Sequence, residues 1–347
     1  MKITKYGAAL LVVMFSLSPA SAWSGKVGWT YNARYPISGS VVVAEGLVLA
    51  GDSAGNLHAV HAASGQLAWV YAGTNTILGQ PAISDKTVVF AQADGTVTAL
   101  SLPDGALLWK HAPPTESYAA DTILDGAAVG YGRVFVIKGD GKMAALSLED
   151  GKALWTYESG AGLRSAPWCA DGMVYLGEQG GVFSAVNPKT GKRDWGGGAG
   201  GAINTPISDG ENVYFSSGDG SVRAVRIKGV VPLWKAIVGE PVVTPPIPAG
   251  EKVFLGTAGG KVAALSKSDG SVLWTFDTHG GAVPGAPVSA LGLVFVCGGQ
   301  GMLFVLDDAS GEAQFTFQAG SGLNGAPAFS GGVLFVGSAD GGLYAIR

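Results

Sequence analysis

The chain has 347 residues, of which 56 are glycine, 47% are hydrophobic and only 14% are charged, and its formal net charge is −4. Nine tryptophans and this apolar fraction can bury a large core, which excludes a disordered chain. No basic patch or Lys/Arg-rich segment is present, which argues against a nucleic-acid partner.

Residues 1–22 have the features of a secretory signal peptide. A start with two lysines precedes an apolar run at 8–17 and an A-x-A cleavage site at 20–22. The apolar run is shorter than the roughly 20 residues that span a bilayer. We therefore predict an exported protein, periplasmic or secreted, that begins at Trp23 and has no transmembrane span after cleavage. A non-cleaved anchor is the alternative, and no cysteine follows the run as a lipidation site.

From residue 41 to residue 317 the chain predicts seven successive units of four short strands. In the second unit the first strand begins near Pro81, and a β-branched and aromatic run at 88–90 follows. An Asp-Gly pair at 94–95 then leads into the third strand, and a second pair at 104–105 leads into the fourth. Tight turns need a positive φ, which Gly, Asn and Asp tolerate best. Each unit is therefore predicted to be a four-stranded antiparallel blade.

An alanine ten residues before a tryptophan and a glycine four residues before it recur along the chain, as in Ala99, Gly105 and Trp109. From Trp69 onward the anchors are spaced by 40, 46, 40, 39, 40 and 41 residues, a period typical of a propeller. We predict that each large aromatic ring docks on the neighbouring blade, in space left by the small alanine and glycine. The predicted docking residues are Trp29, Trp69, Trp109, Trp155, Trp195, Trp234, Trp274 and Phe315.

The copy around Trp234 has its glycine one place early, at Gly229, and the copy around Phe315 keeps only its glycine. Residues 327–347 contain three strands and an anchor alanine but no fourth strand. The segment SGKVGWTY near the mature N-terminus supplies it, because Trp29 lies 40 residues before Trp69. We predict that residues 23–347 form one monomeric, all-β, eight-bladed propeller, closed by the N-terminal strand.

The spacing Ala-x5-Gly-x3-Trp in eight blades resembles the tryptophan-docking motif of the pyrroloquinoline-quinone (PQQ) repeat superfamily, and it covers essentially the whole mature chain. This superfamily includes quinoprotein dehydrogenases, outer-membrane assembly factors of the BamB type and other binding scaffolds. The resemblance therefore implies the fold and leaves the function open.

A quinoprotein dehydrogenase is expected to offer a Glu/Asn/Asp calcium set, an aromatic floor under the quinone and adjacent cysteines. Here the loops that enter the inner strands are poor in carboxylates, and Cys169 and Cys297 are far apart, as expected of free, buried thiols. Trp168 is a candidate floor, with an inner-strand core residue as the alternative. His58 and His61 straddle the two faces of a strand. We predict no cofactor and no metal, and keep a small PQQ-dependent oxidoreductase as the alternative function.

The segment GLRSAPW at 162–168 is similar to a Leu-Arg loop of the BamB family, whose leucine and arginine contact the barrel-forming subunit of the assembly machine. The resemblance implies partner-binding roles for Leu163 and Arg164, with an exposed solvated arginine as the alternative. Two features depart from that family. The segment GAINTP at 201–206 lacks the two aspartates found there, and the lipid-accepting cysteine is missing.

About six extra residues between 111 and 126 place Tyr118, Asp121 and Asp125 on the same predicted face as Arg164. An insertion without function is the alternative. We predict a non-catalytic, protein-binding scaffold of the cell envelope, whose partner is an envelope or outer-membrane protein.

Overall fold

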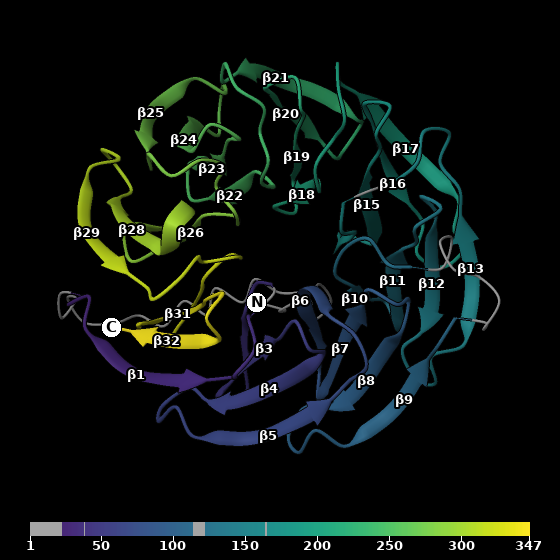
Figure 1. The fold of residues 1–347 in the computed structure, drawn as a ribbon. Coiled ribbons are helices and arrows are strands. Elements are labelled where there is room, and N and C mark those ends of the chain that lie inside the picture. The colour runs from purple at the N-terminus through teal and green to yellow at the C-terminus, as the bar shows by residue number, and fades with distance from the viewer. Residues whose placement is uncertain (1–22, 38, 114–121, 164) are drawn as a thin grey trace, which may run out of the picture.

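Short strands joined by glycine turns build a ring of eight four-stranded antiparallel sheets (Figure 1). The computed structural model describes residues 23–37, 39–113, 122–163 and 165–347. The predicted all-β, eight-bladed propeller is confirmed, and the only helix in the described ranges is the 3-10 turn Gly299–Gly301. No helix among these residues is long and apolar enough to cross a membrane. The predicted signal peptide at 1–22 lies outside the described residues.

The blades are numbered in chain order, and their strands run from the channel to the rim. Blades 1 to 4 consist of β2 (Val42–Ala44), β3 (Leu47–Gly51), β4 (Asn56–His61), β5 (Leu67–Ala72); β6 (Ile77–Ser84), β7 (Thr87–Gln92), β8 (Val97–Ser101), β9 (Leu107–His111); β10 (Ala128–Gly130), β11 (Arg133–Ile137), β12 (Met143–Ser147), β13 (Ala153–Tyr157); and β14 (Trp168–Ala170), β15 (Met173–Gly177), β16 (Val182–Val186), β17 (Arg193–Gly198).

Blades 5 to 8 follow the same order, except that the last blade takes its rim strand from the N-terminus. They consist of β18 (Ile207–Ser208), β19 (Asn212–Ser216), β20 (Ser221–Arg226), β21 (Val231–Ile237); β22 (Ile247–Ala249), β23 (Lys252–Gly256), β24 (Lys261–Ser266), β25 (Val272–Asp277); β26 (Val288–Ala290), β27 (Leu293–Cys297), β28 (Met302–Asp307), β29 (Ala313–Gln318); and β30 (Ala328–Ser330), β31 (Val333–Gly337), β32 (Gly342–Ile346), β1 (Val27–Asn32).

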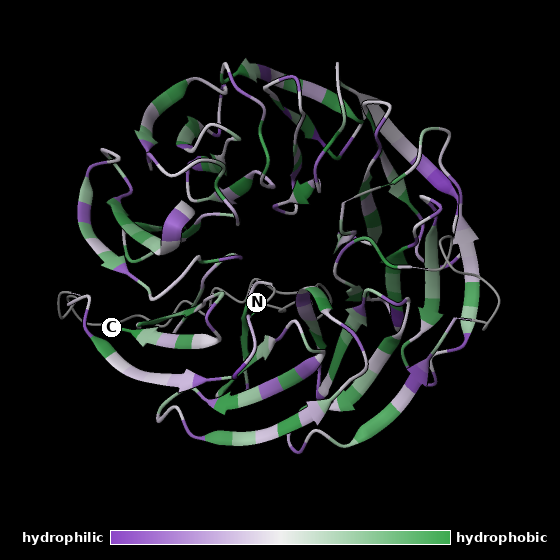
Figure 2. Cartoon of the chain, in the orientation of Figure 1, coloured by the Kyte–Doolittle hydropathy of each residue, from purple (hydrophilic) through white to green (hydrophobic). Residues whose placement is uncertain are grey.

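The core lies between blades rather than within one. The second strand of each blade is buried on both faces, which explains the continuous apolar runs, whereas the rim strands alternate between buried and exposed residues. Figure 2 shows hydrophobic stretches in every blade, interrupted by hydrophilic residues on the rim strands. The hydrophobic clusters combine residues from neighbouring blades, so each blade is stabilised by the next one.

The docking of a tryptophan on the next blade is well illustrated by Trp109. A Cβ placed on Gly151 of blade 3 would lie 2.5 Å from the Trp109 ring, and the Trp109 Nε1–H donates to the Leu148 carbonyl at 2.8 Å. Only glycine fits here, because the ring lies against its Cα and its φ is +71°. The same contact joins Trp29 to Gly65, Trp69 to Gly105, Trp155 to Gly191, Trp234 to Gly270 and Trp274 to Gly311.

One docking position lacks this contact, and another makes it with a smaller ring. Trp195 makes edge contacts with Tyr175 and Phe183 of its own blade, and a Cβ on Gly229, displaced by one residue, would meet Val231 instead of the indole. The smaller Phe315 docks on Gly25, where a Cβ would lie 2.5 Å from its ring, and a second aromatic side chain packs beside it. Trp23 packs edge-on against Phe315, with 5.4 Å between the ring centroids.

The N-terminal strand closes the ring as predicted. β1 pairs antiparallel with β32, and Trp29 lies opposite Ala345. Lys26 and Arg347 exchange two backbone hydrogen bonds of 2.9 and 3.0 Å at the end of this pair. The last blade therefore has its full set of four strands, and the edge of β32 is covered.

Candidate functional site

Long connections lead from the rim strand of one blade to the inner strand of the next, and all of them lie on one face of the ring. In the described residues, isolated backbone bridges join six of these connections to the residue after the second strand of the blade that follows, as between Ile123 and Lys138 and between Leu163 and Glu178. We call this surface the connection face. Its described segments are 33–37, 39–41, 73–76, 112–113, 122–127, 158–163, 165–167, 199–206, 238–246, 278–287 and 319–327.

Leu163 lies in the interior of the protein, not at an exposed loop tip. It is 0% exposed and packs in a cluster with Phe135, Ile137 and Cys169. The expectation that its side chain is offered to a partner is therefore corrected for this structure. The physical reason is its bridge to Glu178, which turns the leucine inward between two blades.

A repeat that the sequence reasoning overlooked explains this burial. The same position carries an apolar residue in every blade, at a period close to that of the tryptophans, and every member is at most 5% exposed. These residues are Ile37, Ile77, Ile123, Leu163, Ile203, Val242, Val283 and Leu323. Leu163 thus occupies a general structural position of the fold.

Asp125 is brought next to the segment that contains Arg164. Its carboxylate accepts hydrogen bonds from the backbone N–H of Gly126 at 2.7 Å and of Ala166 at 3.0 Å. Burial raises the pKa of Asp125, while these two amides lower it by a smaller amount. Asp125 therefore ties blade 3 to the entrance of blade 4. Tyr118, Asp121 and Arg164 lie outside the described residues.

Similar polar contacts join other pairs of blades around the channel. Gln80 donates to the Val41 carbonyl at 2.8 Å, and Asn204 donates to the Val242 carbonyl at 2.7 Å. The N–H of Ala326 donates to the Ser40 hydroxyl at 2.9 Å, which links blade 8 to blade 1. Each bond satisfies a polar group where two blades meet. The contacts of Asp125 are thus one instance of a bracing scheme that holds the connection face in a fixed shape.

Ion pairs add charged groups to the same face. Lys261 Nζ lies 2.6 Å from Glu240 Oε1, and the Thr257 hydroxyl donates to the other oxygen at 2.8 Å. The hydrogen bond from Lys261 lowers the pKa of Glu240 below its ordinary value. Lys142 lies 3.2 Å from Glu158 beside the Leu163 segment. These exposed pairs stabilise little and are available to polar partners.

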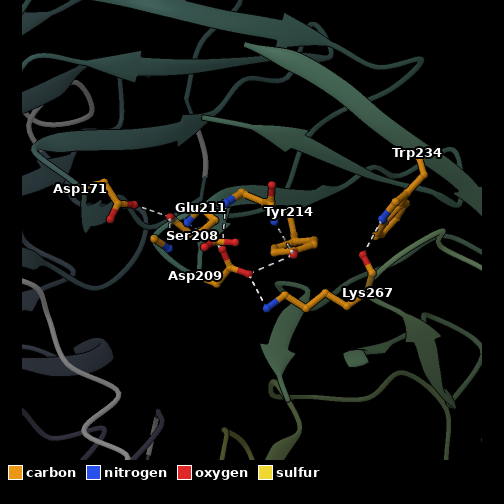
Figure 3. Close-up of polar contacts among 9 residues, drawn as sticks. Asp171, Ser208, Asp209, Glu211, Tyr214, Trp234 and Lys267 are labelled. Atoms are coloured by element: carbon orange, nitrogen blue, oxygen red, sulfur yellow. Dashed lines mark hydrogen bonds and ion pairs between the residues drawn. The ribbon is translucent and has the colours of Figure 1, made fainter. Parts of the chain in front are cut away.

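The opposite face carries the turns between first and second strands and is occupied by inter-blade joints (Figure 3). Asp209 accepts hydrogen bonds from the Tyr214 hydroxyl at 3.0 Å and from Lys267 Nζ at 2.7 Å. Burial opposes ionisation, but Lys267 and nearby backbone amides outweigh it and lower the pKa of Asp209. The carbonyl of Lys267 accepts from Trp234 Nε1 at 2.9 Å. One lysine therefore fastens blade 5 to blade 6 twice, and Asp171 and Ser208 link blades 4 and 5 by a hydrogen bond.

The residues considered for metal or quinone binding lie in blades 1, 4 and 7 of the described residues. Among them no group of three or more His, Cys, Asp or Glu side chains converges. Cys169 and Cys297 are free and buried in blades 4 and 7, and burial raises the pKa of both thiols. Trp168 is half-buried against the blade 4 core. His58 is bonded to Asp52 at 3.1 Å and is a structural residue in this fold.

Comparison with known proteins extends these observations. The family model described as outer membrane protein assembly factor BamB matches residues 15–122, 93–231, 196–291 and 258–347. A curated relative, the outer membrane protein assembly factor BamB of Xanthomonas campestris pv. campestris, is 30% identical over 125 residues. That match covers 33% of this chain and 30% of the relative, so the chain matches less than a third of the relative's length.

Three solved structures share the fold at low sequence identity. BamB from Moraxella catarrhalis has a TM-score of 0.78 at 19% identity, covering 93% of this chain and 99% of that one. The computationally designed Ika8 protein has a TM-score of 0.78 at 18% identity, covering 91% and 97%. The quinohemoprotein alcohol dehydrogenase ADHIIG from Pseudomonas putida HK5 has a TM-score of 0.77 at 13% identity, covering 93% and 76%. Identities this low establish the architecture alone.

Proposed function

This chain belongs to the family of outer membrane protein assembly factor BamB, and from that membership we propose that it is a non-catalytic, protein-binding scaffold with a part in outer-membrane protein assembly. The proposal includes export to the envelope and action as a monomer. The observation that carries it is the family match, which extends over every blade.

The construction of the connection face supports a binding role. Its loops are braced between blades by Asp125, Gln80 and Asn204, so they present a fixed surface that loses little conformational entropy when a partner binds. No cluster of metal-binding side chains occupies the described part of this face. A braced surface of this kind supports the binding and positioning of a partner.

We propose that Arg164 is the principal partner contact, together with Tyr118 and Asp121. An arginine offers a planar fork of donors to carboxylates or to strand carbonyls of a partner. Leu163 has a different role in this proposal, because its buried side chain anchors the backbone that carries Arg164. The proposed partner is the barrel-forming subunit of the outer-membrane assembly machine.

Affinity purification from detergent-solubilised envelopes tests this function. The tagged wild-type protein should capture the barrel-forming subunit, identified by mass spectrometry, and Arg164→Glu should reduce capture roughly tenfold or more. Arg226→Glu, on the exposed end of β20, is the matched charge control and should capture normally. Equal capture by both variants would exclude Arg164 as the contact, and failure of the wild type to capture the subunit would contradict the assembly role.

The quinoprotein alternative is tested separately. Addition of PQQ with calcium should produce no saturable change in absorbance. Saturable binding together with dye reduction on an alcohol would replace the scaffold proposal with an oxidoreductase.

A further inference from the structure

The boundary between blades 4 and 5 departs from the rule followed at most other boundaries. Two residues after the docking ring, five blades carry an aromatic side chain that packs toward the next blade. At four boundaries this ring contacts the residue that precedes the next anchor alanine. The four pairs are Tyr31 with His58, Tyr157 with Ser184, Phe276 with Phe304, and Phe317 with Tyr344.

In blade 4 the equivalent position is Gly197, in a run of three glycines that ends β17. The residue that precedes the anchor alanine of blade 5 is Arg223. Its Nη1 donates a hydrogen bond to the Gly198 carbonyl at 2.7 Å. Arg223 Nε is buried and has no hydrogen-bond partner within the described ranges. The docking contact of Trp195 is also missing here, because Gly229 is displaced. Phe183 of blade 4 fills the space over Gly197, where a Cβ would lie 2.6 Å from its ring, and it packs on Phe215 of blade 5 with 4.5 Å between the ring centroids. This boundary is therefore packed differently from the other boundaries.

A cavity of about 290 Å³ occupies this boundary. Its wall is apolar where Phe215, Val225 and Leu233 contribute, and two cationic side chains, Arg223 and Lys235, complete it. Gly197 and Gly198 of β17 and residues 232–235 of β21 are part of the lining. Because β17 and β21 are rim strands and Lys235 is exposed, the cavity opens toward the rim.

We propose that this cavity binds an aromatic side chain of an extended peptide segment in which a carboxylate lies next to the aromatic residue. An apolar cavity of roughly 150 Å³ already accommodates a benzene ring, so the space suffices for a phenylalanine or tyrosine ring. The ring would pack against Phe215, Val225 and Leu233, which line the cavity. Arg223 and Lys235 provide the complementary charge for the carboxylate, and Arg223 has an unused donor.

The rim strand explains why the ligand is an extended segment. β17 is the last strand in its sheet, so one edge of its backbone has no strand partner in the described structure. Its three terminal glycines present no side chain that would keep another backbone away. A strand laid along this edge can direct one side chain into the cavity. This site is separate from the connection face and does not depend on the proposed function.

Fluorescence anisotropy with a labelled peptide tests the proposal on the full-length protein. The probe is the acetylated, amidated hexapeptide Thr-Val-Phe-Glu-Val-Thr, and the expected result is saturable binding. Peptides with Phe replaced by Ala, or Glu by Gln, should bind roughly tenfold or more weakly. In the protein, Leu233→Trp fills the cavity and Lys235→Gln removes a cation, and both should weaken binding to a similar extent.

Matched controls come from other blades. Leu273 precedes its docking tryptophan as Leu233 does, and Lys110 follows its own as Lys235 does. Leu273→Trp and Lys110→Gln should bind the probe like the wild type. Lys235→Gln and the peptide variants keep the test decisive if Leu233→Trp fails to fold.

Several results would overturn the proposal. They are absence of saturable binding, equal weakening by the control variants, and equal binding of the peptide that lacks phenylalanine. Binding of 3-phenylpropionate as tight as that of the peptide would also overturn it, in favour of a small aromatic acid.

Discussion

Replacing Gly151 by alanine isolates the contribution of a docked tryptophan to the stability of the ring. The new Cβ would lie 2.5 Å from the Trp109 ring, so the indole has to move. Alanine at a φ of +71° adds a backbone cost of roughly 1–2 kcal/mol. Overpacking of a tight site costs about 1–3 kcal/mol. We therefore expect Gly151→Ala to lower the free energy of unfolding by about 2–5 kcal/mol.

Gly132 provides the control for this experiment. Its φ is also +71°, but nothing lies within 4 Å of a Cβ placed on it. Gly132→Ala should cost only the backbone term of roughly 1–2 kcal/mol. Urea-induced unfolding, followed by circular dichroism, gives both values from the shift in midpoint at constant slope. Equal costs for the two variants would refute the packing of Trp109 on Gly151.

A double-mutant cycle adds a second criterion. Once Trp109→Ala has removed the ring, the further change Gly151→Ala should cost no more than Gly132→Ala. Coupling close to zero between positions 109 and 151 would show that the contact contributes nothing to stability.

Four further outcomes follow from the geometry. Deletion of residues 23–31 should lower the free energy of unfolding by at least about 3–5 kcal/mol, the usual cost of removing one large buried aromatic side chain. Because the deletion uncovers the edge of β32, it should also promote aggregation measured by light scattering. An unchanged melting curve would contradict the ring closure. Leu163→Ala should lower the free energy of unfolding by about 2–5 kcal/mol, measured by thermal or urea unfolding. The same change at Leu154, which is 47% exposed, should cost little. Equal costs would contradict the burial of Leu163. Phe315→Trp should be destabilising by about 1–3 kcal/mol because Trp23 already fills the site, and Trp23→Ala should relieve the strain. In a carboxyl-carbon NMR titration the pKa of Asp125 should lie above its ordinary value, and that of Asp150 should be about 2. Because the folded-state pKa of Asp125 is raised, its contribution to stability is full at low pH. That contribution is lost as the pH rises through the folded-state pKa.

The repeat pattern in the sequence determines the architecture, and no knowledge of contacts between blades is needed. A tryptophan every 40 residues or so, with glycine four places before it, specifies a blade and its docking device, because both depend on residues close together in sequence. The closure by β1 was also predictable, since Trp29 stands in phase with Trp69. The prediction that Trp195 docks like the other tryptophans is not matched, because a Cβ on the displaced Gly229 would meet Val231 instead of the indole.

The candidate site was less accessible to sequence reasoning. Leu163 looked like an exposed loop residue beside an arginine, although its apolar counterparts in the other seven blades mark a buried position. Asp125 stands on the predicted face, but its bonds to Gly126 and Ala166 turn it from a free carboxylate into a brace between blades.

What remained for the tertiary structure was the pairing of side chains across blade boundaries. The sequence by itself determined which residues of a strand face outward from their own sheet, through the alternation of the pleat. It did not state which residue of the next blade each one meets, because that depends on the packing of the closed ring. Two examples of such contacts are Arg223 against the strand end that contains Gly197, and Trp23 packed on Phe315. Their consequences, a cavity in one case and a filled site in the other, arise from the volume that remains when two blades pack together.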